Sequence, residues 1–373
     1  MFASSHYAAL GPAPEAQSLA SEVVNLFNDH HFDCQRQNAS ASSCYYLLTF
    51  NHMKKKLLAV LLLASIASFG TAQRQIPTGG PIPDKRGFNI KVDDVKETSQ
   101  VTEVVRRVAG NVYVIAGAGG NIEVQEGPDG LLLVDDNFTV FYPQILAAIR
   151  EISDKPVRIV INTHSHFDHN QNNAEFGKQG ALIFAHPNTR IALMQQTRPT
   201  PVPHEGLPVV TSSEQMTFHF NGEDVTYIPL KPSHTNGDVA VYFHGSDVFA
   251  FGDVFTTDYP AIGVAQGGTI ENFVDNYNLA LQMTTPNTIF VPGHAQLSKR
   301  EDLIAVRDVI TTIHTRFLDM VRKGMTLEQI REARPSKEFD ARFATESFAP
   351  NEMQNSTRWY EQMYNEAKTH LER

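Results

Sequence analysis

A dense run of metal-binding side chains constrains this chain more than any other feature. The sequence Thr-His-Ser-His-Phe-Asp-His-Asn begins at position 163, directly after a short apolar run. In an extended segment alternate side chains share a side, so His164, His166 and Asp168 tend toward one side, and His169 joins them if the chain turns. Imidazole and carboxylate groups suit zinc and other borderline divalent metals. Such crowding would leave these groups repelling or unsatisfied without a cation, so the run predicts a metal centre.

Three further candidate ligands stand at the ends of apolar runs downstream. His234 follows the run 225–230, Asp253 closes the run 248–252, and His294 comes shortly after the run 288–291. Because loops at strand ends gather at one rim of a sheet, these side chains are expected to join the first cluster. Seven ligands exceed the need of one tetrahedral ion and fit two ions that share a carboxylate. Six other histidines are interpreted as polar surface: His186, His204, His219, His244, His314 and His370, of which His204 lies in a proline-rich loop that could border a pocket.

Strand-like and helix-like patterns alternate through two similar halves. Buried strands are predicted over 131–134 and 157–161, and amphipathic helices over 270–283 and after Ser298. Thr269 is the expected cap of the first of these helices. Ser298 with Glu301, and Thr326 with Gln329, are the spacings of capping boxes. The alternation predicts an α/β layered domain over 101–335 rather than several separate domains.

The residues before this domain are expected to be absent from the working protein. Three lysines from Lys54 precede an apolar run that ends in small residues at Ala72, and this run is shorter than the roughly 20 residues that span a bilayer. We therefore predict a cleaved signal peptide over 53–72, a dispensable or artefactual extension over 1–52, and a linker over 73–100. A genuine extension and a transmembrane helix are the alternatives. The protein is then exported, periplasmic or secreted, without a stable membrane anchor.

The amino-acid composition restricts which classes of binding partner are expected. The formal net charge is −10, which disfavours a general nucleic-acid binder and leaves a small-molecule substrate as the expected partner. Both cysteines, Cys34 and Cys44, precede the predicted cleavage point, so the mature chain has no disulfide scaffold. The segment 336–373 is predicted to be a helical tail that packs on the domain, with a lid or a dimer contact as alternatives.

Taken together, these motifs resemble those of the metallo-β-lactamase fold superfamily. The resemblance rests on the 164–169 run, the His234 loop, the Gly252-Asp253 strand end and the Gly293-His294 loop. It implies a four-layer αβ/βα sandwich with two zinc ions at its rim, iron or manganese being the other metals considered. One ion would take His164, His166 and His234, the other Asp168, His169 and His294, with Asp253 bridging. Asp135 matches an acidic residue with a structural, loop-orienting role.

The implied activity is hydrolysis by a metal-bound hydroxide, with Asp168 as the catalytic residue that orients the nucleophile and shuttles a proton. A secreted, β-lactamase-like binuclear zinc hydrolase of small amides or esters is expected. The segment 234–242 is similar to class B β-lactamases, but Asp253 and Thr256 stand where well-known secreted ones carry cysteine and lysine. Asp253 is more similar to glyoxalase II and lactonases. A lactonase or thioester hydrolase, a mononuclear iron sulfur-oxidising enzyme and a non-catalytic metal-binding protein are therefore the alternatives.

Overall fold

The computed structural model describes residues 103–197, 200–294, 296–343 and 353–372. The chain divides after Gln73 into two units. The predicted extension, the predicted signal peptide and the linker all lie outside the described residues. All the described residues belong to the second unit.

A seven-stranded sheet forms one half of the domain. Its strands follow chain order, with β1 to β4 antiparallel and β4 to β7 parallel. All residues of β4 are buried, as expected for a strand covered on both faces. The strands are β1 (Val104–Ala109), β2 (Val112–Ala116), β3 (Ile122–Gly127), β4 (Gly130–Val134), β5 (Val157–Ile161), β6 (Leu182–Ala185) and β7 (Val210–Thr211).

A five-stranded sheet forms the other half, in the order β12-β11-β10-β9-β8. Strands β8 to β11 are antiparallel neighbours, and β12 runs parallel to β11. The strands are β8 (Met216–Phe220), β9 (Glu223–Pro229), β10 (Val239–Phe243), β11 (Val248–Gly252) and β12 (Ile289–Pro292).

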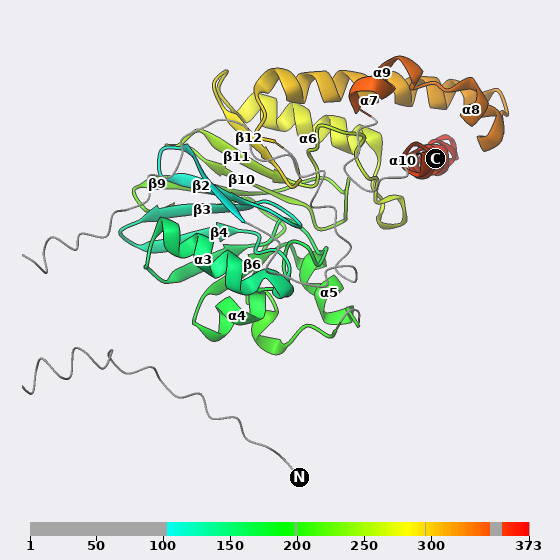
Figure 1. Cartoon of the computed structure of the whole chain (residues 1–373). Helices are drawn as coiled ribbons and strands as arrows, with labels where there is room; N and C mark the ends of the chain where they lie inside the picture. The colour runs from blue at the N-terminus through cyan, green and yellow to red at the C-terminus, as the bar shows by residue number, and fades with distance from the viewer. Residues whose placement is uncertain (1–102, 198–199, 295, 344–352, 373) are drawn as a thin grey trace, which may run out of the picture. The chain divides into compact units, whose positions relative to one another are not determined.

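The two sheets pack face to face between outer layers of helices, which gives the predicted αβ/βα sandwich (Figure 1). Side chains of β10 show how the layers are built, because Val241 enters the core between the sheets whereas Tyr242 enters the core beneath α6 and α7. Likewise Leu132 of β4 faces the other sheet, and Leu133 faces α3. Each of these two strands thus buries apolar side chains on both of its faces.

Helices α3 to α5 cover the seven-stranded sheet, and α6 and α7 cover the five-stranded one (Figure 1). The α-helices are α3 (Tyr142–Ile152), α4 (Asn173–Lys178), α5 (Pro187–Gln195), α6 (Ile270–Met283), α7 (Arg300–Arg322), α8 (Leu327–Ala333), α9 (Lys337–Phe343) and α10 (Met353–Leu371), and short 3₁₀ turns are η4 (Thr139–Phe141), η5 (His204–Gly206) and η6 (Val264–Gln266).

The structure confirms two of the three helix caps that the sequence predicts. The Thr269 side chain caps α6, and Thr326 with Gln329 forms the predicted capping box of α8. The box predicted from Ser298 and Glu301 is wrong. The carboxylate of Asp302 accepts the Lys299 backbone N–H at 3.0 Å, while Ser298 is engaged in a bridge to Phe290 and cannot act as the cap.

The C-terminal helix α10 packs against α7 and α8. Trp359, Tyr360 and Met363 enter the same core as α6 and α7, so the tail extends one outer layer.

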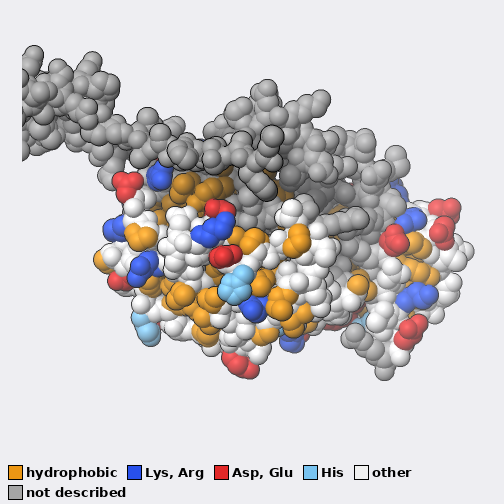
Figure 2. All heavy atoms as spheres, turned by 90° about the horizontal axis from the view of Figure 1, so that it is seen from below, with side chains coloured by type: hydrophobic (Ala, Val, Ile, Leu, Met, Phe, Trp, Pro, Cys, Tyr) orange, Lys and Arg blue, Asp and Glu red, His pale blue; other side chains and the backbone are white. Residues whose placement is uncertain are grey.

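Among the described residues, no helix is both long enough and apolar enough to cross a membrane. On the face formed by α3 to α5, acidic, basic and apolar side chains are interspersed (Figure 2).

Candidate metal centre

All seven predicted ligands meet at one rim of the sandwich. His164, His166, Asp168 and His169 lie in the loop after β5, and His234 lies in the loop between β9 and β10. Asp253 directly follows β11 and His294 follows β12, so both sheets contribute. The strand ends therefore deliver side chains that are 130 positions apart in sequence (His164 to His294) to one place.

The first group consists of three imidazoles with one oxygen of Asp253. The Nδ1 atom of His166 lies 3.0 Å from Nε2 of His164 and 2.8 Å from Nε2 of His234. Oδ2 of Asp253 lies 3.4 Å from Nε2 of His234 and 3.8 Å from that of His164. These atoms are close enough to share one ion.

Asp168, His169 and His294 form the second group. Nε2 of His294 lies 3.1 Å from both Nε2 of His169 and Oδ2 of Asp168. The other oxygen of Asp253, Oδ1, lies 3.3 Å from His169 and 3.5 Å from His294. One carboxylate oxygen therefore faces each group, which is the arrangement of a bridging ligand.

The arrangement fits divalent cations. Imidazole nitrogens meet one another at hydrogen-bond distance, although a pair of nitrogens can share only one proton. Oδ1 of Asp253 is buried and has no donor in hydrogen-bond geometry. Buried groups of this kind normally have partners, so lone pairs converging without donors favour a positive ion between them.

Hydrogen bonds on the outer side of the rings fix which nitrogen faces the centre. His169 donates from Nδ1 to Oδ2 of Asp135 at 2.7 Å, and His234 donates from Nδ1 to the Ala261 carbonyl at 3.0 Å. Thr163 donates its hydroxyl to Asp135, so its oxygen is free to accept from Nδ1 of His164 at 3.0 Å. Each ring then presents an unprotonated Nε2 to the centre, the usual device for metal-binding histidines.

Asp135 adopts a backbone conformation with φ of +61°, which is rare for a residue other than glycine. Its carboxylate also accepts the Thr163 backbone N–H at 2.7 Å. The strained backbone thus aims one buried carboxylate at both the His169 ring and the loop that carries the ligands. This matches the loop-orienting position that the resemblance implies.

Two glycines at the rim occupy positions where a side chain would not fit. Gly252 has φ of +52° and lies against Thr163, while a side chain at Gly293 would collide with Asp253. Glycine at both positions allows the two strand ends to approach the ligand-bearing loops.

Asp238 is a positioning residue that the sequence analysis missed. Its buried carboxylate accepts the backbone N–H groups of His234 and Thr235 at 2.9 Å each, and hydroxyls of Ser233 and Thr235. It closes the loop that presents His234. Its spacing of four residues from a predicted ligand, in a Ser-His-Thr-Asn-Gly-Asp turn, is the signal that could have identified it.

The electrostatics of the two groups differ. Burial lowers the pKa of His166 to about 4, and burial also lowers that of His164. Burial likewise disfavours the charged form of His294, but the carboxylates of Asp253 and Asp168 outweigh it and raise its pKa to about 9. Without metal, His164 and His166 are therefore neutral at pH 7, whereas His294 is protonated.

A pocket of about 430 Å³ opens beside the first group. It is lined by His166, His234, the segment 261–266, and Glu361, Gln362 and Asn365 of α10. Gln362 accepts the Ile262 backbone N–H at 3.3 Å, so the tail contributes a wall to the candidate active site. No spacing in the sequence links positions 361–365 to this rim.

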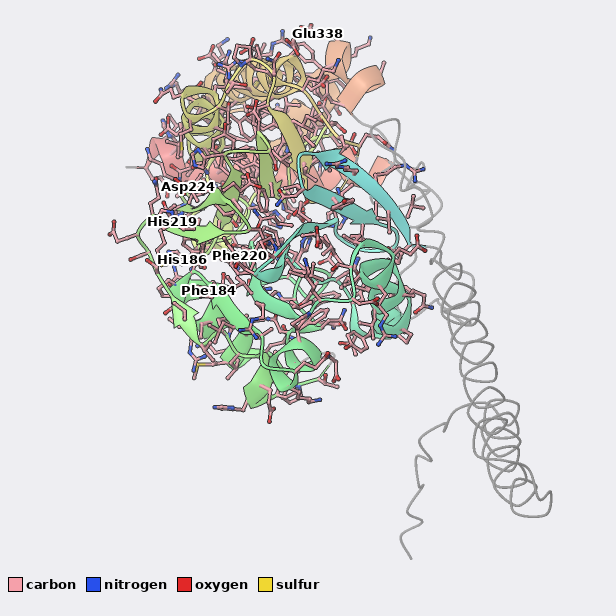
Figure 3. All side chains as sticks on the ribbon, turned by 90° about the vertical axis from the view of Figure 1, so that its left-hand side faces the viewer. Phe184, His186, His219, Phe220, Asp224 and Glu338 are labelled. Carbon is pink, nitrogen blue, oxygen red and sulfur yellow. The ribbon has the colours of Figure 1, made fainter. Side chains whose placement is uncertain are left out.

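Histidines interpreted as surface residues fall into two kinds. His219 pairs with Asp224 on the exposed β8–β9 hairpin, and Nδ1 of His186 accepts a backbone N–H at the start of α5 (Figure 3). His314, by contrast, is buried and contacts Glu366, so the interpretation of His314 as polar surface is wrong. The sequence does not place Glu366 beside it.

Comparisons with known proteins identify the family of the chain. Residues 105–294 match the metallo-beta-lactamase superfamily, and the chain belongs to that superfamily. It is 24% identical, over 69% of its length and 74% of the relative, to 2,4-dinitroanisole O-demethylase subunit alpha from Nocardioides sp. (strain JS1661).

Two solved structures are similar. One is the sec-alkyl sulfatase PisA1 (TM-score 0.54, 16% identity, covering 71% of this chain and 50% of that one). The other is a metallo-beta-lactamase from Pontibacter korlensis (TM-score 0.49, 16% identity, covering 56% of this chain and 99% of that one). The superfamily binds metal ions and is mostly hydrolytic, and the described His and Asp groups are able to hold metals.

Proposed function

We propose that this chain is a hydrolase that uses two divalent metal ions, with zinc expected, to open small ester, lactone or amide substrates. The convergence of seven ligands into two groups that share Asp253 carries this proposal. Ions bound there would polarise a substrate carbonyl and lower the pKa of a bound water to roughly 7.

The chain's own residues supply the proton transfer. Asp168 lies at the open side of the second group, with about a fifth of its side chain exposed. Burial opposes its ionisation, but His169 and His294 outweigh burial and hold the pKa of its carboxyl below the ordinary value. Asp168 is therefore a carboxylate at neutral pH that can orient a nucleophile, accept its proton and pass it to a leaving group.

The pocket favours uncharged substrates. Neither lysine nor arginine is among the described residues that line it, and Glu361 adds a negative charge. Thr256, at the position where well-known β-lactamases grip a carboxylate with lysine, accepts the Asp258 backbone N–H. We therefore place lactones and esters ahead of carboxylate-bearing β-lactams. The relative named for O-demethylation of 2,4-dinitroanisole adds aryl methyl ethers to the substrates worth testing.

The test compares metal-stripped and zinc-reloaded protein on a chromogenic cephalosporin, a lactone series, a p-nitrophenyl ester and 2,4-dinitroanisole. We expect turnover of at least one substrate that chelators abolish, and loss of that turnover in His166→Ala. His219→Ala removes an exposed histidine far from the ligands and should leave turnover unchanged. Full activity in the stripped protein or in His166→Ala contradicts the proposal, and one iron per chain after native purification favours the sulfur-oxidising alternative.

We also propose that the protein is exported after cleavage behind Ala72, leaving no stable membrane anchor. The basic, apolar and small-residue order of 53–72 supports this. N-terminal sequencing of the extracellular or periplasmic fraction should find Gln73 first. A mature form that begins before Met53 contradicts it.

A further inference from the structure

A second cluster of ligand-type side chains lies where three outer helices meet. Glu271 is in the first turn of α6, His314 is in α7, and Glu366 and His370 lie one helical turn apart on α10. Nδ1 of His370 lies 3.1 Å from Oε1 of Glu271, and Nε2 of His314 lies 2.7 Å from Oε2 of Glu366. Ligand atoms of Glu271, Glu366 and His370 all lie within 4.8 Å of one another.

One oxygen of this cluster meets no hydrogen-bond donor among the residues that the structure describes. Glu366 is only 1% exposed, and its Oε1 has no hydrogen-bond donor although Oε2 is held by His314. A buried carboxylate oxygen without a donor costs free energy unless a proton or a cation meets it. In the described part of the chain, the ion pairs of Glu271 and Glu366 are all with histidines rather than with lysine or arginine.

We propose that Glu271, Glu366 and His370 form a further divalent metal site, zinc being the expected ion, which fastens α10 to α6. Two carboxylates and one imidazole are a ligand set that zinc accepts, with solvent able to complete it at the half-exposed His370. His314 is a positioning residue, because it orients the Glu366 carboxylate without itself ligating. This proposal does not rest on the proposed function.

The position of the site gives it a role at the catalytic rim. Gln362 and Asn365, four and one positions before Glu366 on α10, line the pocket beside His166 and His234. A smaller recess next to Glu366 and His370 reaches Val264, which also lines that pocket. An ion at Glu366 would therefore hold the α10 wall of the pocket in place.

The test counts Zn²⁺ ions in the full chain after metal removal, reloading and dialysis, and records the Tm with and without Zn²⁺. We expect His370→Ala and Glu271→Gln each to bind one ion fewer than wild type and to gain less Tm from Zn²⁺. His219→Ala, another exposed histidine paired with a carboxylate, should match wild type. Crystals soaked with Co²⁺ should show anomalous density between Glu271, Glu366 and His370.

Equal ion counts in wild type, His370→Ala and Glu271→Gln would overturn the proposal. Both variants alter partly exposed side chains, so the outcome does not depend on a substitution of the buried Glu366. His314→Gln should keep the site but weaken its Zn²⁺ affinity about 10- to 100-fold. If the seven-ligand centre binds no metal, wild type will hold one ion and His370→Ala none, so failure of the two proposals is distinguishable.

Discussion

Among single residues, Asp135 has the widest influence on the metal centre without facing it. Its carboxylate accepts three hydrogen bonds, from the ring of His169 and from the backbone and hydroxyl of Thr163. Asp135→Asn replaces one acceptor oxygen with an NH₂ group. In place of one of these hydrogen bonds, two donors then face each other and repel. We expect metal affinity to fall about 10- to 100-fold, measured by competition with a chromophoric chelator.

The neighbouring Asp136 provides the matched control for this substitution. It is equally buried, but only one of its oxygens accepts a hydrogen bond, from the Asn172 backbone. Burial raises the pKa of Asp136 well above its ordinary value and so favours the neutral form, which asparagine resembles in shape and charge. Asp136→Asn should leave the metal affinity within about twofold of the wild-type value. Similar losses in both variants would show that burial of a carboxylate, rather than orientation of His169, sets the affinity.

At the scale of elements, the sequence predicts best where a structural element and a ligand are adjacent in the chain. We could predict the strands β4 and β5 because each is a continuous apolar run. We could predict the ligand cluster because its residues follow β5 within a few positions. The edge strand β8, Met216–Phe220, was missed because it is only partly buried and mixes polar with apolar residues. Edge strands carry weaker patterns since one side faces solvent.

The role of α10 could not be read from the sequence for a different reason. Its apolar spacing predicts a packed helix, but not which helix it packs on or that Glu361 reaches the pocket. Likewise His314 carries no local signal, since its partner Glu366 is 52 positions away. Such pairs depend on tertiary packing alone.

The charge of α10 should influence substrate preference. Glu361→Lys places a cation on the pocket wall, so we expect the KM of carboxylate-bearing substrates to fall about two- to fivefold, with little change for neutral esters. Glu372→Lys makes the same charge change at the far end of the helix region and serves as the control. Steady-state kinetics at two salt concentrations distinguish a local effect from a general one, because equal shifts in both variants would indicate only a change in net charge.

At the scale of the whole molecule, the metal centre exists only when both sheets are assembled. Loops of the seven-stranded sheet supply His164 to His169, and loops of the five-stranded sheet supply His234, Asp253 and His294. Ligands that meet only in the folded state make metal binding a source of folding stability. An ion present at 100 times its Kd would add about 2.7 kcal/mol to the free energy of unfolding.

The same linkage makes metal loading depend on pH. In the metal-free chain the pKa of His294 is raised to about 9, so this ring is protonated at pH 7 and must lose its proton before it can ligate. His166, with a pKa lowered to about 4, is already neutral. Burial also opposes the charged form of His169, but the carboxylates of Asp253, Asp168 and Asp135 outweigh it and raise the pKa of that ring. As the pH rises from 6 to 8, the Kd of the second group should therefore fall at least about tenfold per unit.

Calorimetric titration of Zn²⁺ in buffers of different ionisation enthalpy measures the protons released at each step. At pH 7.5 we expect less proton release when the first ion enters the group that contains His164 and His166 than when the second ion enters the group that contains His294, which must lose its proton. His294→Ala should bind the first ion normally and lose the proton-coupled step. Proton release that accompanies the first ion instead would mean that the carboxylates of Asp168 and Asp253 do not control which group fills last.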